Sequence, residues 1–299
     1  MRYEITEDGR RQLTKTQCTF FEFVEGSNAE GNEHHSSNNS GSSDFYGDIR
    51  SYKDMYKACY NGMNVKEMSK VRANLNNLVN HEVETPRKAV VGETLNVSAF
   101  CEGSPYHFYK DADEYGKPRV HLTYSTNATA GVRSNQFIRH GASICALVDQ
   151  LAEQVDIKLS LYITNRGVLG GNGCQVITIK DYDETIDIAR VSATAHPSFF
   201  RRIGFSWFEN ARKLIDPRCS KGYGGSMTGS NRKGVISDED FQEWVGMSND
   251  EMLIDFPAPD EYQFNDDDYT AEWLNQAVKK IETAVDNGDS ICKVYGIRI

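Results

Sequence analysis

Apolar and polar positions follow a regular order between residues 119 and 163, and this order predicts a strand, a helix and a second strand. Apolar and polar residues alternate over 120–124, as they do in a short strand. From Phe137 to Val155, apolar residues recur three or four positions apart and define one continuous helix face. Branched residues dominate 157–163 and predict the second strand. A strand–helix–strand unit is therefore expected here.

The pattern of strands and helices continues toward the C-terminus. A glycine turn leads into a third strand at 174–179, and a fourth strand is predicted at 251–256. Strands that alternate with helices imply a mostly parallel sheet with helices on both faces. We therefore predict an α/β domain over 117–299. Its further helices are expected at 183–195, at 197–215, after a capping box of Ser237 and Asp240, and after a capping Thr270.

Residues 1–116 carry a weaker pattern and are expected to form an N-terminal helical and irregular extension. A short strand is predicted at 18–24 and two helices within 49–83. The stretch 25–48 is rich in serine, asparagine and glycine, so it is too polar to bury a core and is expected to be a flexible loop. Residues 84–111 are rich in turn residues and predict an irregular connector. The sequence leaves open whether the extension is a separate domain.

The order of the predicted elements resembles the von Willebrand factor A-like fold. The resemblance covers about residues 117–287. It rests on the turn VHLTYSTNATAG, the helix FIRHGASICALVDQLAEQ and the closing segments IDFPAP and YTAEWL. The stretch with Arg139, Gly141 and Ala142, followed by FFRRIGF, is also similar to an uncharacterised family of phage and prophage proteins. Together these resemblances imply an A-like core in a phage-type protein.

The turn after the first predicted strand is a candidate binding site. In A-like domains this strand ends in Asp-x-Ser-x-Ser, which binds a divalent metal ion. Here Ser125 stands at the aspartate position, and Asn127 and Thr129 stand at the hydroxyl positions. Because a hard cation prefers charged oxygen ligands, we expect a degenerate site with no metal and no cofactor. The polar turn can still bind another ligand, since sites in open α/β sheets lie at the carboxyl ends of the strands.

A dense aromatic and basic cluster is a second candidate. Aromatic residues beside arginine are typical of protein-interface hot spots and also of single-stranded nucleic-acid platforms. The alternative is that the aromatic residues form the core face of one helix and the arginines its solvent face. The cluster comprises Phe199, Phe200, Arg201, Arg202 and Trp207.

No residue stands out as catalytic. The chain lacks the GxSxG and GxxxxGK[ST] motifs of hydrolases and phosphate-binding loops. Its seven cysteines never form a CxxC pair, which argues against a disulfide framework and a zinc site. Cys145 falls on the apolar helix face and is expected to be inert. Cys292 is predicted to be the most exposed cysteine. We therefore predict that the protein is not an enzyme.

Negative charge is concentrated near the C-terminus. Residues 236–299 hold 16 acidic and 4 basic side chains, in a chain of net charge −10. Such a surface repels a phosphate backbone and complements a basic protein, although it can also be simply a solvated face. The sequence has no apolar run long enough for a membrane span and no apolar signal at its N-terminus, so we expect a cytoplasmic protein.

These observations favour a non-enzymatic protein-interaction or assembly module of phage type. The specific hypothesis is a counter-defence protein that binds and blocks a host antiviral protein complex, as a homo-oligomer in the host cytoplasm. One alternative is a virion or assembly component. Another is a metal-dependent A-domain partner of an ATPase, or a hydrolase.

Overall fold

The structure is a computed structural model of the whole chain. It describes residues 1–8, 11–28, 43–63, 66–78, 88–89, 94–95, 100–101, 108–109, 117–128, 132–152, 154–166, 171–209, 237–249, 251–259, 264–287, 289 and 291–293. Most of the loop predicted at 25–48 and of the connector predicted at 84–111 lies outside these residues. Within them, Ser43–Tyr46 form a short helix, α2, and three two-residue strands form a small sheet of order β3-β5-β4 (Lys88–Ala89, Phe108–Tyr109 and Thr94–Leu95).

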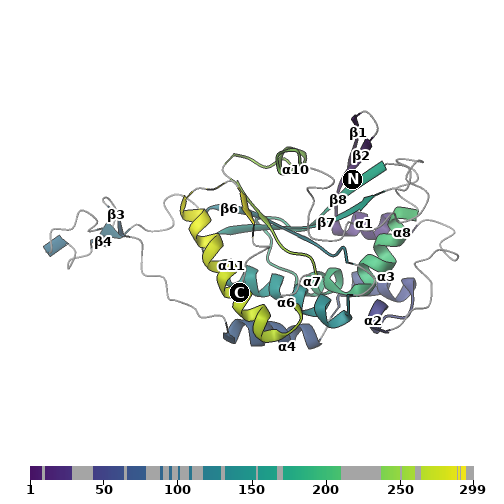
Figure 1. Cartoon of the computed structure of the whole chain (residues 1–299), viewed down its shortest axis with the longest axis horizontal. Coiled ribbons are helices and arrows are strands. Elements are labelled where there is room, and N and C mark those ends of the chain that lie inside the picture. The colour runs from purple at the N-terminus through teal and green to yellow at the C-terminus, as the bar shows by residue number, and fades with distance from the viewer. Residues whose placement is uncertain are drawn as a thin grey trace.

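A larger sheet lies at the centre of the molecule (Figure 1). Its described strands follow the order β1-β2-β8-β7-β6-β9-β10. Four of the six neighbouring pairs are parallel, and the pairs β1–β2 and β7–β8 are antiparallel. The prediction of a mostly parallel α/β sheet is therefore confirmed. The strands are β1 (Arg2–Asp8), β2 (Arg11–Thr19), β6 (Arg119–Ser125), β7 (Asp156–Arg166), β8 (Gly171–Lys180), β9 (Glu251–Asp255) and β10 (Ile291–Lys293).

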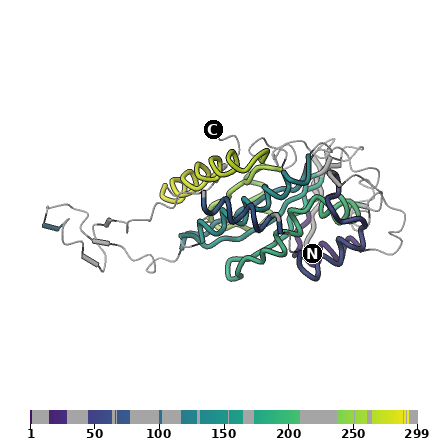
Figure 2. Tube along the Cα trace, turned by 90° about the horizontal axis from the view of Figure 1, so that it is seen from below, coloured from purple at the N-terminus to yellow at the C-terminus, as the bar shows by residue number. Residues whose placement is uncertain are grey.

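Helices cover both faces of this sheet. One face packs against α10 (Asp238–Val245), whose Phe241 and Trp244 join a cluster with strand residues such as Tyr162 and Leu253. The other face carries the larger core, in which α4, α6 and α11 lie side by side (Figure 2). The helices on this face are α1 (Phe20–Gly26), α3 (Tyr52–Asn61), α4 (Lys66–Leu78), α6 (Ser134–Leu151), α7 (Ile188–Ala195), a π-helical turn η4 (Phe199–Gly204), α8 (Phe205–Glu209) and α11 (Asp267–Asn287).

Strand β6 is buried on both of its faces. Alternate residues point to opposite sides of a strand, so Leu122 and Tyr124 face the larger core, whereas Thr123 and Ser125 face the side of α10. The strand pairs in parallel with β7 on one side and β9 on the other. This central position explains why β6 combines apolar and polar side chains that are all protected from water.

Helices α6 and α7 approach each other closely at Gly141. A Cβ atom at this position would lie 2.2 Å from the Cβ of Ala195. No larger residue fits there without moving one of the helices. Gly141 therefore has a clear role in helix packing.

The N-terminal residues belong to the same fold as the rest of the chain. β2 pairs in parallel with β8 and extends the large sheet. Phe23, Met55 and Leu75, from α1, α3 and α4, are fully buried in the larger core. The expected boundary at residue 116 thus does not separate two cores in the described part of the chain. Residues before it complete the sheet and cover one of its faces.

The strand predicted at 18–24 is wrong beyond Thr19. A helix begins at Phe20 because Thr19 and Glu22 form a capping box. The Glu22 amide donates to the Thr19 hydroxyl (3.3 Å), and the Thr19 amide donates to the Glu22 carboxylate (2.8 Å). The apolar residues at 20–24 suggested a strand, yet Phe20, Phe23 and Val24 form the buried face of α1, and Phe21 is exposed.

Helix α11 also begins earlier than predicted, at Asp267 instead of after Thr270. The Asp266 carboxylate accepts a hydrogen bond from the Tyr269 amide (2.9 Å). The Thr270 hydroxyl donates to the Asp266 carbonyl (2.6 Å), so Thr270 lies inside the first turn. The cap predicted at Ser237 is confirmed, since its side chain accepts from the Asp240 amide (3.0 Å).

None of the described helices combines the length and the apolar composition that crossing a lipid bilayer requires.

The core beneath α11 generates a stability prediction. Trp273 is fully buried against the rings of Phe256 and Phe264, at centroid distances of 5.1 and 5.7 Å. Trp273→Ala should lower the free energy of unfolding by about 3–5 kcal/mol, because it removes this burial and leaves a cavity. Tyr269→Ala, at an exposed position of the same helix, should change it by no more than about 0.5 kcal/mol. Urea unfolding curves of both variants test this, and equal effects would contradict the assigned core.

Candidate functional site

The carboxyl ends of β6, β7 and β9 bring several polar side chains to one edge of the sheet. Ser125 ends β6, Thr126 and Asn127 follow it, Thr164 lies near the end of β7, and Asp255 ends β9. All five side chains are buried, with at most 4% of their surface exposed. This cluster, called the strand-end cluster below, contains two of the three residues that the sequence selected. Thr129 lies outside the described residues.

Asn127 binds the neighbouring strand and the turn itself. Its backbone amide donates to the Ser125 hydroxyl (3.1 Å). Its side-chain amide donates to the carbonyl of Thr164 and to the Thr164 hydroxyl, the latter at 3.2 Å. Asn127 therefore closes the β6 turn against β7. These bonds direct its amide nitrogen inward, away from an external ligand.

Asp255 supplies a carboxylate to the strand-end cluster. It is 1% exposed and accepts a hydrogen bond from the Tyr162 hydroxyl (3.2 Å). Asp255 pairs with Thr123, and Tyr162 pairs with Ser125, so Asp255 and Ser125 are diagonal neighbours on one face. Asp255 was not among the site residues predicted from the sequence. Its position at the end of a predicted strand was the available signal, since strand ends in such sheets meet at one edge.

The strand-end cluster does not fit the divalent cation that the sequence resemblance implies. Magnesium requires several hard, mostly charged oxygen ligands in nearly octahedral geometry. The cluster has one carboxylate, on Asp255, and the other oxygen donors are neutral side chains. Among the described residues, no group of three His, Cys, Asp or Glu side chains is placed to hold a metal ion.

His140 holds the segment after β9 against α6. Its Nε2 donates to the Pro257 carbonyl (2.8 Å), which leaves the lone pair on Nδ1. Nδ1 has no hydrogen-bond partner within the described part of the chain. The ring is fully buried beside Phe256 and Phe264, and this burial lowers the pKa of His140 to about 3. His140 is therefore a neutral, structural histidine.

A second buried histidine lies on the face covered by α10. His121 is 1% exposed, and its Nε2 is 2.9 Å from the Ser160 hydroxyl on the paired strand β7. The ring is therefore part of the protein interior. Together with Ser160 it links β6 to β7 below the strand-end cluster.

The aromatic–arginine cluster is inside the protein and does not form an exposed interface in this structure. Phe199, Phe200 and Trp207 belong to the larger core, and the Trp207 ring stacks on Phe23 with centroids 5.2 Å apart. Each of the five residues has at most 4% of its surface exposed. The alternative weighed for the aromatic residues is correct. The solvent face expected for Arg201 and Arg202 is wrong.

The two arginines are buried because they bind backbone carbonyl groups of a distant segment. Arg201 donates to the carbonyls of Phe45 and Val132, and its guanidinium lies 3.9 Å from the centroid of the Phe45 ring. Arg202 donates to the carbonyls at positions 49 (3.2 Å) and 50 (2.9 Å). Its guanidinium lies 3.8 Å from the centroid of the Tyr46 ring. We call this arrangement the arginine clasp; it fixes residues 45–50 to η4.

The cysteines differ from expectation at one position. Cys292 is 3% exposed, and its thiol donates weakly to the Lys280 carbonyl (3.9 Å), because β10 turns it beneath α11. Cys101 is the exposed cysteine among the described residues. Cys145 is fully buried, and burial raises its pKa to about 12, so the thiolate required for nucleophilic chemistry is absent near neutral pH.

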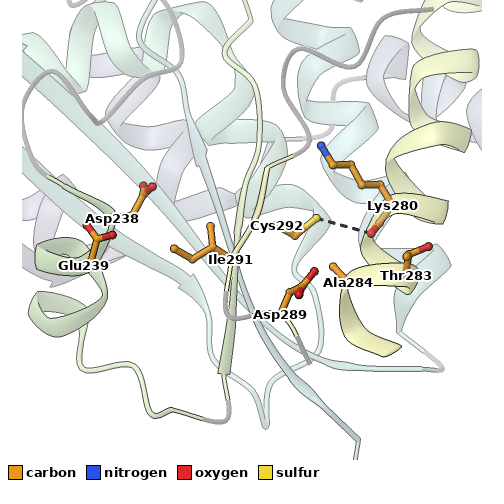
Figure 3. A pocket seen from close by; sticks show the side chains of 8 residues that line it. All are labelled: Asp238, Glu239, Lys280, Thr283, Ala284, Asp289, Ile291 and Cys292. Atoms are coloured by element: carbon orange, nitrogen blue, oxygen red, sulfur yellow. Dashed lines mark hydrogen bonds between the residues drawn. The ribbon is translucent and has the colours of Figure 1, made fainter. Parts of the chain in front are cut away.

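Two helices near the end of the sheet present acidic surfaces. Glu239, Asp240 and Glu243 are exposed on α10. Glu272 and Asp286 are exposed on α11, which also exposes two lysines, at 279 and 280. α10 and α11 lie on opposite faces of the sheet and flank β10 (Figure 3). The acidic composition of the C-terminal region is thus exposed as carboxylates on both helices, and on α11 two lysines lie among them.

These features define a mixed α/β protein with a mostly parallel sheet and a closed polar strand edge. A family model described as "Domain of unknown function (DUF7192)" matches residues 13–284. The match covers most of the chain, and the chain belongs to this family. Its start at residue 13 agrees with the participation of β2 in the large sheet. No curated protein and no solved structure matches the chain.

The composition of the strand-end cluster predicts weak or absent binding of divalent cations. Millimolar Mg²⁺ or Mn²⁺ should raise the melting temperature by less than about 1 °C. A ligand that binds only the native state stabilises it more as its affinity rises, so a weakly bound ion stabilises it little. Differential scanning calorimetry tests this. A rise of several degrees that disappears in both Asp255→Asn and Ser125→Ala would show that the cluster binds metal.

The low pKa of His140 predicts a pH dependence of stability. Above pH 6.5 the imidazole is neutral in both folded and unfolded chains and contributes nothing. Between pH 6.5 and about 3, only the unfolded chain takes up the proton, so stability falls as the pH falls. The contribution is roughly 1.4 kcal/mol per pH unit. His140→Gln should show a shallower fall than the wild type in urea unfolding at several pH values. Parallel curves would contradict the assignment.

Proposed function

We propose that this chain is a von Willebrand factor A-like module that acts by binding another protein. The arrangement of β6 to β10 supports the A-like part of the proposal. β6 lies at the centre, β7 and the antiparallel β8 follow on one side, and β9 and β10 follow on the other. This arrangement agrees with the strand, helix, strand, hairpin strand order on which the resemblance rests.

The acidic surface on α10 and α11 carries the functional part of the proposal. Exposed carboxylates lie on α10 and α11, the two helices that flank β10, where they can attract and orient a basic partner protein. The same charge disfavours a nucleic-acid backbone. The strand-end cluster offers less, because its side chains are buried and Asn127 binds β7. Ser125 and Cys145, which could act as nucleophiles, have at most 1% of their surface exposed, in keeping with a non-enzymatic role.

A narrower proposal is that the partner is a host protein complex that a phage-type protein blocks, with several copies of this chain in the assembly. It rests on the sequence resemblance at 139–142 and 199–205. The residues that carry this resemblance serve the fold. Arg139 forms an ion pair with Asp267 at 2.7 Å, and Gly141 allows α6 to approach α7. Their likeness to phage proteins is therefore a likeness of fold and does not indicate which protein is bound. Experiment has to identify the partner.

A tagged pull-down from a host-cell lysate, with the eluate sized by light scattering, tests protein binding. We expect a stoichiometric complex that dissociates as the ionic strength rises from about 0.1 M to 1 M, because the Debye length then falls from about 10 Å to 3 Å. The double variant Glu243→Gln/Glu272→Gln should retain less partner. The control Glu25→Gln/Asp183→Asn removes two exposed carboxylates elsewhere and should bind as the wild type does. A monomer without a partner would contradict the proposal.

A further inference from the structure

A groove of about 670 Å³ lies beside β10 (Figure 3). Asp238 and Glu239, in the first turn of α10, form one wall. The second half of α11 forms the other wall, with Lys280, Thr283 and Ala284. The floor comes from Asp289, Ile291 and Cys292, in and just before β10. The groove is thus bounded by one strand and by a helix from each face of the sheet.

β10 is the last strand of the sheet in the described part of the chain, and it pairs there with β9 alone. The side chains of Ile291 and Cys292 are turned inward. Cys292 belongs to the core beneath α11, and Ile291 packs against the cluster beneath α10. The backbone of β10 therefore faces outward along the plane of the sheet. An edge strand presents amide and carbonyl groups that can pair with an added strand.

The charges of the groove favour an added strand that carries basic side chains. Asp238, Glu239 and Asp289 contribute three carboxylates, and among the described residues Lys280 is the cationic side chain that lines the groove. Glu239 and Asp289 are exposed. Side chains of an extended segment alternate between two faces, so lysines or arginines at every second position can all face carboxylates. Small apolar residues between them then point toward α11 and can contact Ala284.

We infer that the groove beside β10 receives an extended basic segment of the partner protein, which pairs with β10 as an added strand. This inference rests on the proposed protein-binding function and names its docking mode. Backbone hydrogen bonds to β10 supply affinity, and the carboxylates of the groove supply the preference for lysine and arginine. The short length of β10, three residues, limits the pairing to a correspondingly short segment.

Binding of labelled peptides to the full chain tests the inference by fluorescence anisotropy. The probe is acetyl-Lys-Val-Lys-Val-Lys-Val-Lys-amide carrying fluorescein. Its glutamate counterpart, with every Lys replaced, should bind at least about tenfold more weakly because of charge repulsion. An analogue with proline at the central valine has the same charge but lacks a strand donor. It should bind at least about fivefold more weakly.

Charge reversals in the chain locate the binding site. Glu239→Lys and Asp289→Lys should each lower the affinity for the lysine peptide by about fivefold or more. Asp183→Lys makes the same charge change at an exposed position after β8 that does not line the groove, so its affinity for the peptide should stay within about twofold of the wild type. Circular dichroism establishes that each variant is folded before it is compared. In the wild type, peptide binding should also slow hydrogen exchange at the backbone amides of β10.

Two results would overturn the inference. Equal binding of the proline analogue would indicate general electrostatic adhesion without an added strand. Equal losses of affinity in Glu239→Lys and Asp183→Lys would place the peptide outside the groove. If the pull-down yields a partner whose capture Glu239→Lys leaves unchanged, the docking mode fails while the binding function stands. If the pull-down yields no partner but the peptides behave as expected, the groove binds strands and the proposed function fails.

Discussion

Strand β6 hydrogen bonds in parallel to β7 on one side and to β9 on the other, and both of its faces are buried. Parallel strands require crossover connections, and the helices in these connections must cover the sheet. The strand also carries His121, Thr123 and Ser125 on one face. Buried polar groups are costly unless they are hydrogen-bonded. The side of α10 therefore contains a set of internal bonds, such as Thr123 to the Ile254 carbonyl (3.0 Å).

The same requirement shapes the edge where a ligand site was expected. A polar side chain at the end of a parallel strand can bind a ligand or bind its neighbours. Here Asn127 and Asp255 bind neighbours, on β7 in both cases. The bonds that close this edge also hold the three central strands in register. What the protein can present to a partner is consequently its outer surface, where the acidic residues of α10 and α11 gather.

Local patterns predicted the central elements well, because β6, α6 and β7 are defined by the spacing of their own residues. Errors arose where another interaction decided the outcome. The capping box of Thr19 and Glu22 converted an aromatic strand pattern into a helix. Arg201 and Arg202 looked like solvent residues because their partners are carbonyl groups about 150 positions earlier in the chain. Asp255 gained importance only from the register of β9 against β6, which no local spacing records.

The arginine clasp has a consequence for how this protein changes over evolution. Its guanidinium groups bind carbonyl oxygens, so they recognise the path of the backbone at 45–50 and not most of its side chains. Most side chains of the segment have contacts of their own. The rings of Phe45 and Tyr46 lie against the arginines, and Gly47 has a φ of 70°, with His196 2.6 Å from where a Cβ would lie. The Asp48 carboxylate lies 3.1 Å from His196 Nε2, and Ile49 packs against the larger core. At position 50 the clasp binds the carbonyl while the side chain is exposed, so substitutions in this segment should be tolerated best there.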